Sequence, residues 1–216
     1  MQPEPPPAAA RKLLITAGPT REPIDEVRYI SNRSSGQLGI ALAEAAADVG
    51  HEVTLLLGPV LVPSTLGDRV AVRRFTTTAE LEALLREAFP THDDLIMAAA
   101  VADFRVASAL MGKTERKKAL EIKLEGTPDL VAGVAANKRS DQRVIAFALE
   151  EPHQLEARAV AKMRRKGVDA IVANPLVTMD APGIDALLLW ADGRKQRPGA
   201  MGKPAFARWL VERLGE

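Results

Sequence analysis

Short apolar runs alternate with amphipathic stretches along most of the chain, and this alternation constrains the fold more than any other feature. Mostly apolar runs of this length are typical of strands buried in a parallel sheet. The apolar runs are residues 12–17, 52–57, 70–75, 94–101, 143–148 and 170–173. Helical spacing between them predicts crossover helices, for example over 36–49 and 79–89. The pattern predicts an α/β fold with a doubly wound, mostly parallel, Rossmann-like sheet.

Two segments depart from this pattern. Residues 1–10 are rich in proline and are expected to form a disordered tail, which leaves 11–216 as a single domain. Residues 104–118 are charged and weakly patterned, and Leu120, Ile122 and Leu124 then alternate as in a half-exposed strand. We therefore expect a protruding insertion at about 104–125.

Composition excludes several classes of function. The formal net charge is +1, from 29 basic and 28 acidic side chains, so charge gives no reason to expect nucleic acid or a membrane surface as a partner. Cysteine is absent, which excludes disulfides, thiolate metal sites and cysteine nucleophiles. No apolar run reaches the length of about 20 residues that a membrane span needs. A soluble cytoplasmic protein is the resulting expectation.

The first long loop, Gly18 to Gly39, contains the clearest candidate for an anion site. A simple connection in such folds takes about 2–6 residues, so a long ordered loop is more often functional. Ser34, Ser35 and Gly36 precede a predicted helix, where hydroxyls and backbone N–H groups favour an anion. An ordinary helix cap explains the serines equally well, but the arginines and the asparagine nearby favour a phosphate ligand. Spacing leaves the class of nucleotide open.

Residues 15–39, ITAGPTREPIDEVRYISNRSSGQLG, closely resemble the signature of the phosphopantothenoylcysteine synthetases. Relatives of this family also form the C-terminal half of a bifunctional flavoprotein. The resemblance extends over essentially residues 12–214. Further motifs follow in the family order: Ala98–Asp103, Thr127–Asp129, Phe147 within a GFAAET-like motif, Arg165–Asp169 and Ile171–Asn174.

The resemblance implies a two-step ligase reaction in coenzyme A biosynthesis. The carboxylate of 4′-phosphopantothenate attacks the α-phosphate of CTP or ATP, and the cysteine amine then displaces the nucleoside monophosphate. CTP is favoured over ATP, because most bacterial members use it. Mg²⁺ is expected to be held mainly by the phosphates and water, and no metal-ligating residues are assigned. The implied partners are the two substrates and a second copy of the chain in a homodimer. The flavin-binding half is absent from this sequence, so no flavin is expected.

The resemblance also assigns roles to individual residues. It places Asn32 at the acyl-nucleotide intermediate, where a neutral amide can stabilise the developing oxyanion. The residues that match nucleotide-contacting positions are Gly18, Ser34, Ser35, Gly36, Ala98, Ala99, Ala100, Asp103, Phe147, Lys166 and Asn174. Without the family, Phe147 is an ordinary core aromatic and Asn32 an ordinary turn residue.

Lys113 matches a lysine on a mobile lid, where it can neutralise charge that develops on the α-phosphate. Lys117 and Lys118 are alternatives for the same role, because this chain reads KTERKK where the family motif is K-x-K-K.

Two other functions remain open at this point. A nucleotide-binding regulator would keep the loop but lack ligase activity, and the altered lid and GFAAET-like motif favour it. A Rossmann-type oxidoreductase is disfavoured, because the chain has no G-x-G-x-x-G after its first strand.

Overall fold

A single eight-stranded sheet forms the body of the computed structural model, which describes residues 10–60, 66, 68–108, 111–113, 115, 119–178 and 181–215. The strand order is β13-β12-β10-β9-β6-β1-β4-β5. The strands are β1 Lys12–Ala17, β4 Glu52–Leu57, β5 Val70–Arg74, β6 Asp94–Met97, β9 Arg143–Glu150, β10 Ala170–Pro175, β12 Leu187–Trp190 and β13 Lys195–Gln196. All pairs from β10 to β5 are parallel, and β12 is antiparallel to both of its neighbours. The predicted doubly wound, mostly parallel sheet is confirmed.

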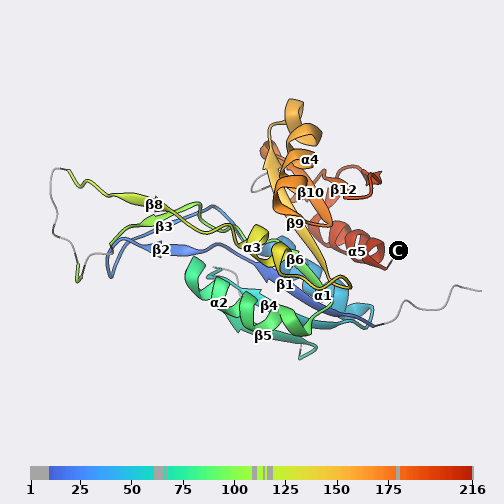
Figure 1. Cartoon of the computed structure of the whole chain (residues 1–216), viewed down its shortest axis with the longest axis horizontal. Coiled ribbons are helices and arrows are strands. Elements are labelled where there is room, and N and C mark those ends of the chain that lie inside the picture. The colour runs from blue at the N-terminus through green and yellow to red at the C-terminus, as the bar shows by residue number, and fades with distance from the viewer. Residues whose placement is uncertain are drawn as a thin grey trace, which may run out of the picture.

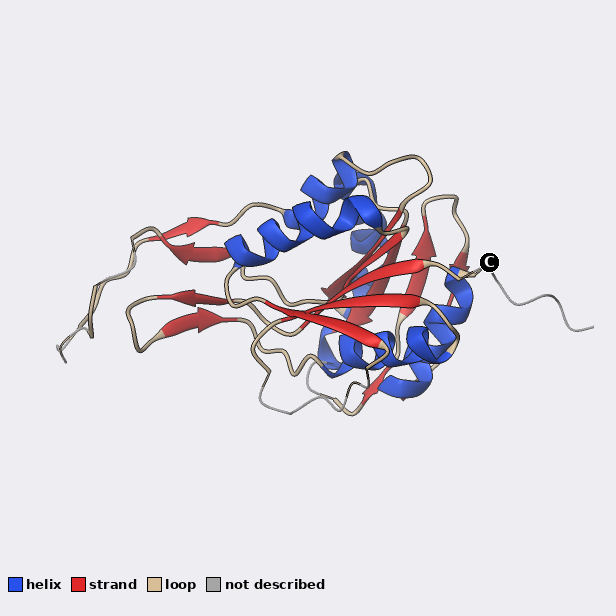
Figure 2. Ribbon diagram, turned by 90° about the horizontal axis from the view of Figure 1, so that it is seen from below, coloured by secondary structure: helices blue, strands red, loops and turns tan. Residues whose placement is uncertain are grey.

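Helices cover both faces of this sheet (Figures 1 and 2). Because side chains alternate along a strand, Leu13 and Ile15 pack toward one face and Leu14 toward the other. The core of the first face includes α1 (Gln37–Asp48) and α5 (Lys203–Leu214). The second core includes α2 (Thr78–Ala88), α3 (Leu130–Ala136) and α4 (Leu155–Lys166). Among the described residues, no helix has the length and apolar character that crossing a bilayer requires.

Two ribbons project from the body side by side (Figure 1). The first pairs β2 (Arg21–Pro23) with β3 (Tyr29–Ser31), and the second pairs β7 (Phe104–Val106) with β8 (Leu124–Gly126). We call these two ribbons the antenna. Sequence analysis predicted a protrusion at 104–125 only, so the first ribbon is an addition to that prediction.

The remaining short elements lie between these parts. β11 and β14 form a small ribbon, and three short 3₁₀ segments follow α2, β9 and β10. Their bounds are β11 Gly183–Ile184, β14 Met201–Gly202, and 3₁₀ segments Phe89–Thr91, Pro152–Gln154 and Leu176–Thr178.

Three helices begin with different kinds of cap. α1 is preceded by Gly36, which is in the left-handed region (φ 71°) and has no side chain to cap the helix. α2 is capped by Thr77, whose hydroxyl accepts from Glu80 N–H, and not by Thr78. α3 is capped by the carboxylate of Asp129, not by the hydroxyl of Thr127 two residues earlier. The predicted 1–10 tail lies outside the described residues except for Ala10, which is exposed.

At the end of the sheet where the parallel strands begin, a buried carboxylate joins neighbouring strands. Asp94, fully buried at the start of β6, accepts bidentate hydrogen bonds from both Arg11 and Arg143, with a shortest distance of 2.7 Å to each. Arg143 also donates to the carbonyl of Leu214 at the end of α5. These bonds fix one edge of the sheet and leave the opposite, carboxyl edge to the loops that bear the predicted site.

Candidate functional site

The predicted crevice lies where β1 and β6 end. The chain leaves β1 through α1 toward β4, and leaves β6 in the opposite direction toward β9, with α3 on the other face. Such a reversal of strand order opens a crevice at the carboxyl ends of the strands. The loops here are held together, because Ala100 N–H donates to the carbonyl of Gly18 (2.9 Å) and Thr20 N–H donates to that of Ala100 (3.2 Å).

The start of α1 forms one wall of this crevice. Gly18 (φ 81°) and Gly36 (φ 71°) are both left-handed, and a side chain on Gly36 would lie 2.7 Å from Val60 and 3.3 Å from the backbone nitrogen of Gly18. The first regular helical bond runs from Ile40 N–H to the carbonyl of Gly36, so the preceding N–H groups emerge at the helix end. This backbone suits an anion, as the sequence predicted.

The two serines line the same wall. The hydroxyl of Ser34 accepts from Gly36 N–H at 3.3 Å, and that of Ser35 lies 3.5 Å from Gln37 N–H. Ser35 is exposed and Ser34 half-buried. Both hydroxyls therefore lie beside the helix end, where a ligand can replace these long bonds.

The loop from Ala98 to Asp103 forms the opposite wall. The side-chain amide of Asn32 donates to the carbonyl of Val101 at 2.8 Å, so the first predicted catalytic residue lies directly on this loop. Asn32 is exposed, and among the described residues its side-chain carbonyl oxygen and second amide hydrogen make no further hydrogen bond. Asp103 is exposed, and its backbone carbonyl accepts from Thr127 N–H. The structure thus brings Asn32, Ala98–Ala100 and Asp103 together.

Phe147 and Asn174 come from the neighbouring strands β9 and β10. Phe147 is half-buried and packs with Ala98 against the α1–α5 side of the core. Asn174 lies two residues after Val172, which belongs to the same core, so both side chains project to that face. Asn174 is buried, and among the described residues its side-chain oxygen has no hydrogen-bond partner. A buried oxygen without a partner can accept a hydrogen bond from a bound ligand.

Lys166 lies elsewhere. It is in the last turn of α4, and its ammonium binds both carboxylate oxygens of Asp129 at 2.7 Å. Burial alone raises the pKa of Asp129, but the hydrogen bonds from Lys166 and Ala132 N–H outweigh it and hold the pKa below its ordinary value. Lys166 therefore joins α4 to the cap of α3, and the structure does not place it beside the start of α1.

Lys113 is at the outer end of the antenna. Its neighbour Gly112 exchanges hydrogen bonds with Glu26, in the turn between β2 and β3. Lys113 itself is exposed and is not brought into the crevice that holds Asn32. Lys117 and Lys118, the alternatives for the lid lysine, lie outside the described residues.

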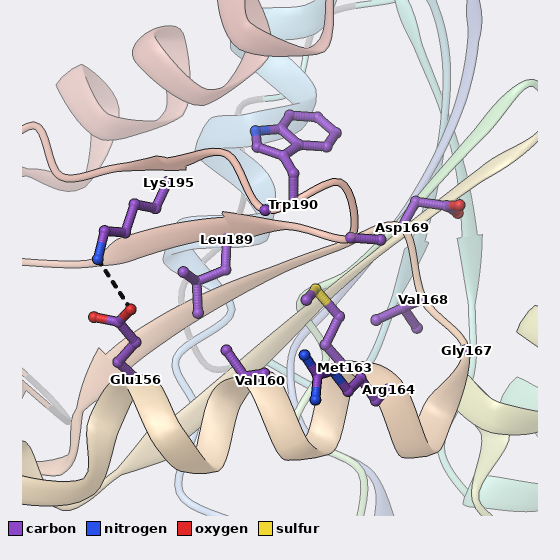
Figure 3. Close-up of a pocket in the computed structure, with 12 residues that line it drawn as sticks. Glu156, Val160, Met163, Arg164, Gly167, Val168, Asp169, Leu189, Trp190 and Lys195 are labelled. Atoms are coloured by element: carbon purple, nitrogen blue, oxygen red, sulfur yellow. Dashed lines mark hydrogen bonds and ion pairs between the residues drawn. The ribbon is translucent and has the colours of Figure 1, made fainter.

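Two grooves lie away from the crevice. One, of about 450 Å³, runs between α4 and the β12–β13 hairpin, with an ion pair between Lys195 and Glu156 across its rim (Figure 3). The other, of about 560 Å³, lies between α2 and α3. Asp129, which lines the second groove, forms an ion pair with Lys166, one of the predicted nucleotide residues. Within the described ranges, no group of three or more histidine or carboxylate side chains is placed to hold a metal ion.

Sequence reasoning missed several residues that shape the crevice. Gly58, after β4, admits no side chain, because a Cβ would lie 2.4 Å from the carbonyl of Pro19. Gly39 allows α1 to pack closely on β1, because a Cβ at this position would lie 2.5 Å from the Cβ of Ala17. Thr16 is a fully buried polar residue whose hydroxyl accepts from Ala99 N–H at 3.1 Å. A glycine directly after an apolar run, and a threonine inside one, were the signals available in the sequence.

Known proteins resemble this chain over most of its length. The family model "DNA/pantothenate metabolism flavoprotein C-terminal domain" matches residues 8–216. The chain is 39% identical to the coenzyme A biosynthesis bifunctional protein CoaBC of Vibrio cholerae, over 95% of this chain and 52% of that relative. It is 42% identical to the protein of the same name from Escherichia coli, over 86% of this chain and 47% of that relative. The chain thus spans about half the length of these curated relatives.

A solved structure extends the likeness to three dimensions. The crystal structure of the C-terminal domain of a CoaBC protein superposes with a TM-score of 0.82 at 30% identity, over 97% of each chain. Both the sequence and the fold match over nearly the whole chain. The chain therefore belongs to the family of DNA/pantothenate metabolism flavoprotein C-terminal domains.

Proposed function

We propose that this chain is a ligase that joins 4′-phosphopantothenate to cysteine through an acyl-nucleotide, as a step of coenzyme A biosynthesis. One observation carries the proposal: Asn32 donates to the loop Ala98–Asp103, and this loop is hydrogen-bonded to Gly18 beside the start of α1, so the predicted anion site adjoins an uncharged amide. The match to CoaBC proteins over this chain's length supports the pathway.

A carboxylate must be activated before an amine can displace one of its oxygens. Its oxygen is a poor leaving group, so the carboxylate oxygen attacks the α-phosphorus, and pyrophosphate departs. The cysteine amine then attacks the acyl carbon, loses a proton, and releases the nucleoside monophosphate with that oxygen attached. A neutral donor such as the Asn32 amide stabilises the oxyanion of this second step without strengthening the hold on the anionic substrate.

We assign CTP as the preferred nucleotide and Mg²⁺ as its counterion. The choice of CTP rests on the bacterial sources of the relatives named above. Mg²⁺ is expected on the triphosphate and water, since Mg²⁺ keeps several waters and often binds through substrate phosphates. Lys113, at the antenna end, can act only if the ribbon bends toward a crevice, in its own or a second subunit.

The direct test is to incubate the chain with 4′-phosphopantothenate, cysteine and Mg²⁺, with either CTP or ATP. We expect the amide product by mass spectrometry, one pyrophosphate per product, and at least a tenfold higher kcat/KM with CTP. Nucleotide binding by calorimetry without any product would instead favour the regulator.

Replacing Asn32 tests the assignment of the second step. We expect Asn32→Ala to lower kcat by about 10²–10³, as for other single oxyanion donors, while the acyl-nucleotide accumulates. Asn137→Ala is the matched control, because Asn137 also donates to a backbone carbonyl but at the end of α3. Normal turnover of the intermediate in Asn32→Ala would remove Asn32 from the mechanism.

A further inference from the structure

A buried polar chain runs from the root of the antenna into the loop Ala98–Asp103. Glu22, in β2, is only 4% exposed, and its Oε1 accepts from both the backbone N–H (2.8 Å) and the hydroxyl (2.7 Å) of Thr78. The hydroxyls of Thr78 and Thr20 lie 3.4 Å apart. Thr20, fully buried, accepts from Ala102 N–H at 2.9 Å. Four groups from three segments are thus linked inside the protein.

Each hydroxyl has one hydrogen, which fixes the direction of this chain. The Thr78 hydroxyl donates to the carboxylate, the stronger acceptor. Since the only hydrogen of the Thr78 hydroxyl is donated to Glu22, the bond between the two hydroxyls must use the hydrogen of Thr20. The direction therefore runs from Ala102 through Thr20 and Thr78 to Glu22, which accepts at the end without donating.

A second route joins the same residues through the backbone. Thr20 and Glu22 are two residues apart in an extended segment, so their side chains project to the same side. Between them, Arg21 N–H donates to the carbonyl of Thr76 at 2.7 Å. The attachment of Glu22 to the start of α2 therefore also fixes where Thr20 lies.

Besides its backbone bonds to Gly18, Thr20 and Thr127, the loop that receives this chain is held by further side-chain contacts. Asn32 binds the carbonyl of Val101, and the Thr127 hydroxyl binds that of Ala102 at 2.5 Å. Thr16 binds Ala99 N–H, as described above. Thr20 is the acceptor for Ala102 N–H, so its position sets the position of the residue beside Asp103.

We infer that Glu22 is a positioning residue, which acts through Thr78 and Thr20 to hold the loop Ala98–Asp103 in the shape that receives the nucleotide. The structural part of this inference stands on the contacts alone, and its link to the nucleotide rests on the proposed function. Through Glu22, the orientation of the antenna and the shape of the crevice are coupled.

The start of α2 supplies a matched control. Glu80 also binds this helix end, with Thr76 N–H at 2.6 Å and Thr77 N–H at 3.4 Å, but it is exposed and belongs to the helix itself. Both glutamates place a carboxylate at the same positive helix end. Only Glu22 continues to Thr20 and the loop, so a comparison of the two separates positioning from helix capping.

The first experiment measures hydrogen exchange of individual backbone amides in the ligand-free full chain. We expect Glu22→Ala and Thr78→Val to speed exchange at Ala102 at least tenfold, while Ile96, in the core strand β6, keeps its rate. Glu22→Gln retains an acceptor oxygen and is expected to restore most of the protection. Glu80→Gln is expected to loosen only the first turn of α2. Wild-type exchange at Ala102 in Thr78→Val, or equal acceleration by Glu80→Gln, would overturn the inference.

The second experiment uses the ligase assay. We expect Glu22→Ala to raise the KM for the nucleotide at least fivefold with little change in the KM for cysteine, and Glu22→Gln to recover it. Combining Thr20→Val with Glu22→Ala is expected to add little to either change alone, because both break one chain. Independent, additive effects would contradict the coupling. If the chain makes no product at all, the proposed function fails, while the exchange result still decides the positioning role.

Discussion

Gly36 shows how much of the crevice depends on a single residue. Its left-handed backbone, with φ 71°, suits glycine because other residues rarely adopt it. Its Cα also packs against Gly18, where a side chain would enter the space of Val60. The residue therefore sets both the direction in which α1 begins and the distance between α1 and the end of β1.

Replacing Gly36 separates these two effects. We expect Gly36→Ala to lower the free energy of unfolding by about 1–3 kcal/mol, the usual range for a strained backbone, with additional cost from the contact with Val60. Gly50→Ala is the control, because Gly50 also has positive φ (91°) but open space around it. Urea unfolding of both variants measures the difference. Equal losses would mean that the close approach at Gly36 costs nothing.

The places of individual candidate residues in the fold were predictable where a motif coincides with a strand end. Gly18, Ser34–Gly36 and Ala98–Ala100 each follow a buried strand or precede a helix, so topology brings them to one edge. Lys166 was not predictable in this way, since a lysine at a helix end carries no information about its partner, here Asp129. Glu22 and Thr20 were missed because their contacts join segments more than 50 residues apart in the sequence.

At the scale of elements, α3 and α4 are joined by one ion pair. Asp129 caps α3 through Ala132 N–H, and Lys166 ends α4. Because the pKa of Asp129 is lowered in the folded chain, its contribution to stability is present above its ordinary pKa and is lost as the pH falls through the folded value.

Stability as a function of pH tests this link. Asn is also a good helix cap, so Asp129→Asn removes mainly the charge. At pH 7 we expect this variant to be less stable than the wild type by about 0.5–1 kcal/mol, the range for partly exposed pairs. The difference should shrink once the pH falls below the ordinary pKa of Asp129, about 3.9, and vanish only when the pH is below its lowered pKa in the folded chain. Denaturant unfolding at several pH values, with Lys166→Met as the parallel variant, measures it. A difference that persists at low pH would contradict the charge-based account.

Elements of the body were more predictable than those of the antenna. The strands β1 and β4 were predicted with their observed bounds, because an unbroken apolar run marks a strand buried on both faces. The predicted helix starts at 36 and 79 each differ by one residue from the observed starts at Gln37 and Thr78, since neighbours such as Thr77 and Thr78 are equally good caps in sequence. β2 and β3 have three residues each and almost no apolar pattern, so nothing local distinguishes them from a loop.

The described part of the molecule has a compact body and an antenna that none of its helices covers (Figures 1 and 2). Isolated two-stranded ribbons are marginally stable in water, and these expose several apolar side chains. The exposed residues are Val27, Tyr29, Phe104, Met111, Leu120 and Leu124. A second copy of the chain that packs on the antenna would bury them, which supports the proposed homodimer.

Matched valines test the dimer. Val27 in the antenna and Val49 on the body are both 59% exposed. We expect Val27→Ser to raise the dimer dissociation constant at least tenfold, or about 1.4 kcal/mol, and Val49→Ser to leave it unchanged. Sedimentation equilibrium over a range of concentrations measures both. A monomeric wild type, or equal effects of the two substitutions, would rule out an antenna-mediated dimer.

The path of one oxygen atom tests the proposed ligase chemistry most directly. With ¹⁸O in the carboxylate of 4′-phosphopantothenate, attack on the α-phosphorus must place one labelled oxygen in the nucleoside monophosphate. Mass spectrometry of the products is expected to find that label in CMP and none in pyrophosphate. Label in inorganic phosphate, with a nucleoside diphosphate as co-product, would show activation through the γ-phosphate and contradict the acyl-nucleotide route. Absence of any product would contradict the ligase itself.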